Sequence, residues 1–208
     1  MENAYGMHEF NEIFNEPFTN WTKKLDQKDF KDGMKITIHQ RKMPGYSTDM
    51  LRVDATFQGI SMQQLLDYFI DPPPGKMEMM KESRILEKID EYTCVKYQRI
   101  KMPMMSDRDQ VLSIHHEPID KNSTYIIIQT VEREDCPEVP GAVRMSMFLR
   151  ALIRKNPESP EDTVDFTEIN CFNMKGYMPG RLLNMVIASE ASKEMTNMYK
   201  YLASENKK

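Results

Sequence analysis

The spacing of apolar residues changes from a period of two along much of this chain to steps of three and four at its C-terminal end. Between residues 48 and 58 apolar and polar side chains alternate, which is typical of a β-strand with one buried face. From about residue 179 to residue 204 apolar residues recur every three or four positions, which predicts one long amphipathic helix. We therefore expect a sheet with a helix covering one of its faces.

Further segments are predicted as strands because turn-forming residues bound their runs of β-forming side chains. They are residues 35–41, 84–90, 92–101, 109–117, 123–134, 142–154 and 163–172. Helical spacing predicts a helix over residues 10–25, kinked at Pro17, and a short helical piece over residues 76–82. Another helix is expected over residues 61–70, with Ser61 as its N-cap and three consecutive prolines after its end. Strands joined by turns and covered by one long helix indicate an α+β fold.

Length and composition favour a single domain, which we expect to span residues 1–208 with a core of about 20–205. The chain has 208 residues, 29% charged and 40% hydrophobic, and its mean hydropathy is -0.62. No apolar run approaches the ~18 residues of a membrane-spanning helix, which excludes a membrane-embedded protein. The formal net charge of -4 offers no attraction for nucleic acid. Three widely spaced cysteines and a start without a secretory signal predict a cytoplasmic protein.

No motif for metal binding or catalysis stands out. Of the four histidines, His115 and His116 are adjacent on a predicted strand, so their side chains point to opposite faces and cannot share a metal there. Metal-binding HExxH and CxxC spacings are absent, as are the P-loop, G-x-G-x-x-G and G-x-S-x-G patterns. The sequence therefore predicts no metal, no cofactor and no enzyme activity.

Three segments resemble the motifs of one protein family. Residues 105–112 (MSDRDQVL) resemble the S-x-R-D-[FY]-V signature of StAR-related lipid transfer (START) domains. Residues 139–144 (VPGAVR) and 172–184 (FNMKGYMPGRLLN) resemble a strand start and the beginning of the last helix of that family. The resemblance covers nearly the whole chain. It implies a helix-grip fold, in which a curved antiparallel sheet of about nine strands and a C-terminal lid helix enclose one lipid.

The resemblance also implies a set of ligand-binding residues. Phosphatidylcholine transfer protein-like members, which this chain resembles most in character, surround choline with aromatic side chains. Those positions fall on Tyr97, Gln110 and Phe148, and a neighbouring polar position falls on Arg150, whose guanidinium could bind phosphate. The family's phosphate-binding arginine is replaced by proline here, and Lys76 is close enough to take its place.

The choice between lipid classes depends on two further positions. Where cholesterol-binding members carry a buried Glu–Arg pair, this chain has Val95 and Ile114, which favours a phospholipid over a sterol. One conflict stays open in the strand over residues 142–154, because alternation alone would bury Met147 and Leu149, whereas the resemblance turns Phe148 and its polar neighbours inward. Either the cavity has a polar wall here, or the assigned register is off by one residue.

A flexible apolar loop and the start of the last helix are the expected gate. The loop carries Met102, Met104 and Met105, and the helix carries Leu183 and Ile187. The resemblance implies that they open against a membrane surface to exchange the lipid. We expect a monomer that binds one lipid and transfers it between membranes. The alternatives are an enzyme that uses the cavity as its active site, which would require a titratable pair inside it, or a sterol-binding or signalling module.

Overall fold

The computed structural model describes most of the chain. It covers residues 12, 14–73, 75, 77, 79–102, 105–176 and 180–206, without the side chains of residues 180–182 and 186. The helices are the 3-10 helix η1 (Phe18–Asn20) and the α-helices α2 (Met62–Ile70) and α3 (Gly180–Glu205). The strands are β1 (Thr22–Lys31), β2 (Met34–Arg41), β3 (Met50–Gln58), β4 (Met80–Lys88), β5 (Thr93–Ile100), β6 (Asp107–Asp120), β7 (Ser123–Thr130), β8 (Ala142–Arg144), β9 (Ser146–Lys155) and β10 (Thr163–Asn173). No helix among the described residues is long and apolar enough to cross a membrane.

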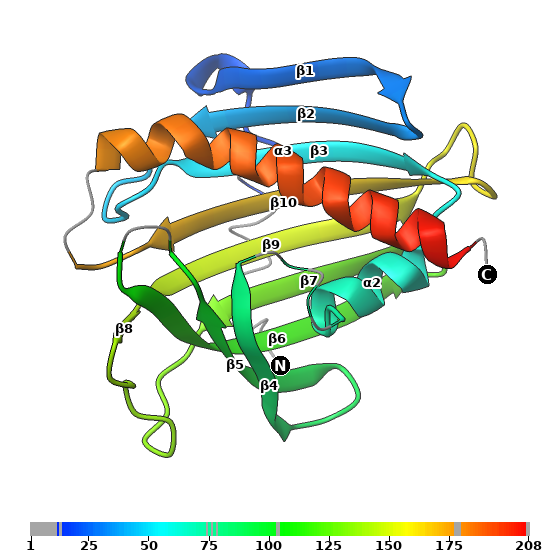
Figure 1. Cartoon of the computed structure of the whole chain (residues 1–208). Coiled ribbons are helices and arrows are strands. Elements are labelled where there is room, and N and C mark those ends of the chain that lie inside the picture. The colour runs from blue at the N-terminus through cyan, green and yellow to red at the C-terminus, as the bar shows by residue number, and fades with distance from the viewer. Residues whose placement is uncertain are drawn as a thin grey trace.

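The strands form one curved sheet in the order β1-β2-β3-β10-β9-β7-β6-β5-β4. Neighbours along this path are antiparallel, and the short β8 pairs in parallel with β6. Helix α3 crosses one face of the sheet, and α2 lies over the same face beside the C-terminal half of α3 (Figure 1). The predicted α+β helix-grip fold is confirmed, with ten strands where about nine were expected.

Two segments that were expected to be helical are strands instead, both at an edge of the sheet. Residues 22–25 were expected to be helical, but they begin β1, in which Leu25 pairs with Ile38 of β2. Residues 80–82 were expected in a helical piece, but Met80 begins β4 and pairs with Ile100 of β5. In each case the backbone hydrogen bonds of a neighbouring strand outweigh the local helical spacing.

Helix α2 begins where the sequence predicts. The Ser61 hydroxyl accepts a hydrogen bond from the Gln64 backbone N–H (3.2 Å), and the Gln64 side-chain oxygen accepts one from the Ser61 N–H (2.9 Å). This reciprocal pair satisfies two backbone donors at the helix start. The helix buries Leu65, Leu66 and Tyr68, and the Tyr68 ring lies 6.1 Å from the Tyr201 ring of α3.

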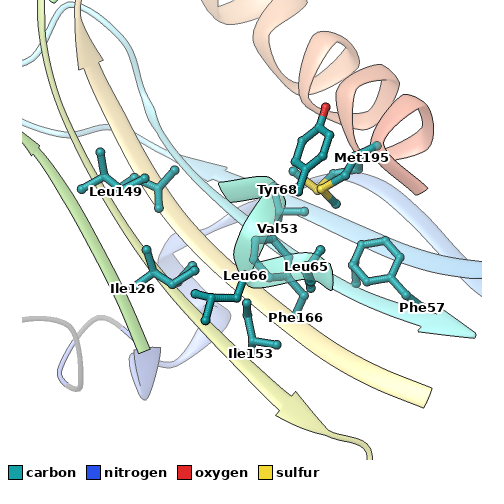
Figure 2. Packing of buried hydrophobic residues seen from close by; sticks show 14 of the residues in the cluster. Val53, Phe57, Leu65, Leu66, Tyr68, Ile126, Leu149, Ile153, Phe166 and Met195 are labelled. Atoms are coloured by element: carbon teal, nitrogen blue, oxygen red, sulfur yellow. The ribbon is translucent and has the colours of Figure 1, made fainter. Parts of the chain in front are cut away.

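The main hydrophobic core lies between the concave face of the sheet and the two helices. Strand residues such as Val53, Phe166 and Ile153 alternate inward, and α3 contributes Met195 and other residues of its apolar stripe. Figure 2 shows the side chains of α2 between the sheet and α3. We call this side of the sheet the inner face, and the opposite side the outer face.

The C-terminal half of α3 is attached closely to the sheet. Met198 and Leu202 are buried, and the Tyr199 ring stacks on Phe57 at 6.0 Å between centroids. The Tyr199 hydroxyl donates to the Gln58 carbonyl oxygen (3.2 Å). Gly33 permits this contact, because a Cβ there would lie 1.9 Å from the tyrosine oxygen.

Candidate ligand-binding site

Two polar residues of β10 stand in the middle of the apolar inner face. Glu168 lies opposite Val53 of β3 and Ala151 of β9, and Asn170 follows two positions later on the same face. Each is only 5% exposed. The Asn170 amide nitrogen donates a hydrogen bond to the Glu168 carboxyl. A carboxyl group is thus held beneath the lid helix, far from bulk solvent.

Burial is the main cause that raises the pKa of Glu168 to about 7. The hydrogen bond from Asn170 opposes this rise, whereas the charge of Glu194 on α3 adds to it. Burial raises the pKa because the ionised carboxylate loses its hydration, and a nearby negative charge acts in the same direction. Near neutral pH, Glu168 is therefore divided between its neutral and its charged form.

Glu194 brings a second carboxyl group toward the same region from the lid. Burial raises its pKa, with a further contribution from the charge of Glu190, and its own charge helps to raise the pKa of Tyr68 on α2. Glu194 nevertheless retains exposed surface. A carboxyl group of α3 therefore acts on the carboxyl group of β10.

Other polar side chains of the inner face are tied into the protein. The Gln110 amide nitrogen donates to the Gln98 side-chain oxygen (3.0 Å). Lys96 is fully buried, and its ammonium donates to the Ile70 carbonyl oxygen (2.9 Å) and to the Asp71 carboxylate (2.6 Å). The lysine thereby satisfies acceptors at the end of α2, and its charge is paired there.

The residues predicted to bind the ligand are not brought together. Gln110 lies on the inner face, whereas Tyr97 packs on the outer face with Val111 and its neighbours. Phe148 and Arg150 also lie on the outer face, since the intervening Leu149 belongs to the inner core.

The outer-face residues of β9 already have partners of their own. The Phe148 ring contacts Tyr46 edge to face at 5.4 Å. The Arg150 guanidinium donates to the Ile128 carbonyl oxygen (3.2 Å) and to the Gln129 side-chain oxygen (3.0 Å). The structure thus follows the strand alternation and not the register that the resemblance implied. The other ligand-binding candidate, Lys76, lies outside the described residues.

Four of the five predicted gate residues can be placed. Met102 and Leu183 are half-buried, Ile187 is buried in the inner core, and Met105 is 39% exposed. Met104 lies outside the described residues. The β5–β6 loop and the N-terminal end of α3 lie at the same end of the molecule (Figure 1).

Arg108 and Asp109 at this end bind protein groups. Arg108 donates to the carbonyl oxygens of Ser106 (2.7 Å) and Met174 (2.7 Å), which joins the start of β6 to the segment before α3. Asp109 is fully buried and accepts two hydrogen bonds from the Arg144 guanidinium, each of 3.0 Å. The motif that carries the resemblance therefore joins the start of β6 to the segments before β9 and α3.

Glu168, Asn170 and Glu194 were not predicted as site residues. The sequence contained a signal for Glu168 and Asn170. They follow Val164 and Phe166 at steps of two along the strand, so they are polar residues on the same buried face. Glu194 had no comparable signal, because a glutamate beside an apolar stripe usually faces solvent. Among the described residues, no three histidine, cysteine or acidic side chains gather as a metal site.

Comparisons with known proteins show where this fold has been seen before. No family model and no curated protein matches the chain. The solved structure of human StAR-related lipid transfer protein 5 matches over 96% of this chain and 94% of its own, with a TM-score of 0.78 and 17% identity. Human STARD10 matches over 96% of this chain and 79% of its own, with a TM-score of 0.76 and 16% identity. A fragment of a STAR-related lipid transfer protein from Xanthomonas axonopodis covers 88% of this chain and 99% of its own, with a TM-score of 0.71 and 16% identity. The chain therefore has the START-domain fold.

Proposed function

We propose that this protein binds one lipid between the inner face of its sheet and helix α3, and transfers that lipid between membranes. The observation that carries the proposal is the apolar inner face covered by α3, in a fold whose solved examples include proteins named for lipid transfer. An apolar interior with a few polar groups suits an amphiphile, because the acyl chains replace water along the apolar walls.

The lipid enters and leaves at the N-terminal end of α3, because the two halves of that helix are held differently. The C-terminal half is attached through Tyr199 and buried methionines, as described above. Near the N-terminal end, the Asn184 side-chain oxygen accepts from the Asp49 N–H (2.9 Å), and Met185 is 78% exposed. Exposed apolar side chains at this end suit transient contact with a membrane surface.

The finer expectations are proposals that stand on the resemblance. A phospholipid is favoured over a sterol, since Val95 and Ile114 replace the charged pair of the cholesterol-binding members. We also propose that the chain acts as one lipid-binding domain, as a monomer in the cytoplasm, without a nucleic-acid partner. The lipid is bound and released unchanged.

Native mass spectrometry of the purified protein, followed by extraction and identification of the bound molecule, tests lipid binding directly. One lipid per chain is the expected result. A protein that carries no lipid and takes none from mixed vesicles would overturn the proposed function. Recovery of a chemically altered lipid would instead favour the enzyme alternative.

Transfer of a fluorescent lipid between vesicles tests the gate. Met105→Asp and Met185→Asp should each slow transfer severalfold, because a charge at these positions opposes contact with the membrane interior. The matched control is Ile119→Asp, since Ile119 is 55% exposed but lies near the other end of β6. Equal slowing by all three variants would remove the gate from the mechanism and leave lipid binding intact.

A further inference from the structure

We propose that Glu168, Asn170 and Glu194 form a polar subsite that binds the head of the lipid through the lipid's own hydrogen-bond donors, a hydroxyl or a protonated amine. The inference rests on the proposed lipid-binding function and narrows the class of lipid. It differs from the choline-binding set implied by the resemblance, of which Gln110 alone lies on the inner face.

The first step of the argument is the position of the acceptors. Glu168 is 5% exposed and flanked on the neighbouring strands by Val53 and Ala151, two side chains that form no hydrogen bonds. Among the described residues, no basic side chain forms an ion pair with Glu168. Buried carboxyl groups in proteins are normally paired or hydrogen-bonded, because their desolvation is costly. Among the described residues, the Asn170 amide nitrogen supplies the one hydrogen bond that is recorded to the Glu168 carboxyl.

The second step is a shortage of donors on the inner face. The side-chain oxygens of Asn170, Gln40 and Gln110 are buried and have no hydrogen-bond partner within the described part of the chain. All three are acceptors, and all three residues lie on the inner face. An unpartnered buried acceptor destabilises the fold, so each such group calls for an explanation. A ligand that brings donors into the interior supplies one.

The third step is the position of Glu194 on the lid. Glu194 directly precedes Met195, which is buried in the core between α3 and the inner face that carries Glu168. The charge of Glu194 helps to raise the pKa of Glu168 and of Tyr68 on α2. A donor group bound between Glu168 and Glu194 contacts the lid and the sheet at once. Binding of the head then stabilises the closed position of α3, and loss of the head favours opening.

The same geometry disfavours an anionic group at this place. A phosphate near Glu168 and Glu194 would meet negative charge and acceptors, and the buried Lys96 is paired with Asp71. The group that fits at this place is therefore a hydroxyl, or an amine that retains an N–H bond. In a phospholipid, this donor is a group of the head other than the phosphate. The hydroxyl and the amine both donate hydrogen bonds, and the choice of probe lipids distinguishes one from the other.

The experiment uses two pairs of lipids with the same acyl chains, offered together in mixed vesicles to the delipidated full chain. The first pair is 1,2-dioleoylglycerol and its 3-acetyl derivative, which lacks the hydroxyl donor. The second pair is 1,2-dioleoyl-3-dimethylammonium-propane and its trimethylammonium analogue, which lacks the N–H donor. Bound lipids are quantified by mass spectrometry, and the result is the ratio within each pair.

The wild-type protein should prefer the donor-bearing member of at least one pair by about tenfold or more, since the blocked member leaves buried acceptors unpartnered. The pair that shows the preference identifies the hydroxyl or the amine as the source. In Glu168→Leu the ratio should fall toward one while total lipid uptake persists, because only acceptors are lost. The control Glu161→Leu, in an exposed loop before β10, should retain the wild-type ratio.

Ratios near one for both pairs in the wild-type protein, with normal lipid uptake, would overturn the subsite and leave the proposed function standing. Preference for the blocked members would overturn it as well. Failure to take up any probe or any vesicle phospholipid would overturn the proposed function itself. The wild-type ratios decide the matter even if Glu168→Leu does not fold, and Asn170→Leu then serves as the second variant.

Discussion

Replacing Glu168 by glutamine should stabilise the protein at and above neutral pH and change its stability little in acid. Burial raises the pKa of this carboxyl to about 7 in the folded protein, against an ordinary value of 4.5. Glutamine has nearly the same shape, retains an oxygen that accepts from Asn170, and carries no charge. The substitution therefore removes the cost of ionising a buried group and leaves the packing in place.

The sign and the size of the effect follow from proton linkage. Between about pH 4.5 and 7 the folded protein holds the Glu168 proton and the unfolded chain releases it, so the free energy of unfolding falls as the pH rises. The interval between the two pKa values corresponds to about 3 kcal/mol. Below the lower pKa both states are protonated and the cost is absent. Above the upper pKa the full free-energy cost of the buried charge is present and no longer changes with pH.

The ionisable groups that face Glu168 modify the pH dependence of the unfolding free energy without changing its sign. Glu194 on α3 also has a raised pKa, through burial and the charge of Glu190. The charge of Glu194 adds to the rise in the pKa of Glu168, in the same direction as burial. On α2, burial raises the pKa of Tyr68 to about 12, so this phenol stays neutral throughout the range.

Denaturant unfolding of the delipidated protein at several pH values between 4.5 and 8 measures the effect. A bound ligand would add its own stabilisation, so the lipid must first be removed. The excess stability of Glu168→Gln over wild type should grow from near zero at pH 4.5 to about 3 kcal/mol at pH 8. The control Glu161→Gln should show no such growth. An excess that is constant with pH, or a variant less stable than wild type at pH 8, would refute the reasoning.

Two further substitutions test contacts that hold the fold. Gly33→Ala should lower the denaturation midpoint more than Gly45→Ala, because both glycines have positive φ (87° and 83°) but only the first would place a Cβ against the Tyr199 hydroxyl; equal losses would contradict this contact. Asp109→Ala should cost about 3–5 kcal/mol of unfolding free energy, because it leaves the Arg144 guanidinium without its buried carboxylate. A loss below ~1 kcal/mol in denaturant unfolding, typical of an exposed pair, would show that this pair is not structural.

The elements that the sequence predicted best are those with a buried face. In β3, alternation marks the side that packs against the helices, and in α3 the apolar stripe marks the side that faces the sheet. Strand β1 was missed because it is an edge strand with no fully buried residue, so its sequence carries little alternation. Its conformation comes from the backbone of β2, which no local pattern reports.

At the candidate site, strand alternation alone predicts correctly which residues of β9 lie on the inner face. Two neighbouring residues of a strand cannot face the same side, so a choice between Phe148 and Leu149 decides the whole of β9. The apolar pattern favours Leu149, and the structure agrees. The strand expected over residues 142–154 is in fact two, with Met145 between β8 and β9. Alternation nevertheless continues across this break, because Met145, Met147 and Leu149 all belong to the inner core.

The carboxyl group of Glu168 links stability to function in a way that neither sequence pattern nor fold demands. An aliphatic residue between Val53 and Ala151 would satisfy the packing of the inner face without the cost of a buried charge. If that cost is offset only by a ligand's donors, then Glu168→Leu, which removes the carboxyl group, must both stabilise the protein and lose selectivity among lipids. Glu168→Gln gains stability at pH 8 while it retains one acceptor, and Glu168→Leu removes both acceptors. Stability without a change in lipid ratio for Glu168→Leu would place the carboxyl outside recognition. A joint gain in stability and loss of selectivity would identify recognition of the lipid as the reason that the charge is retained.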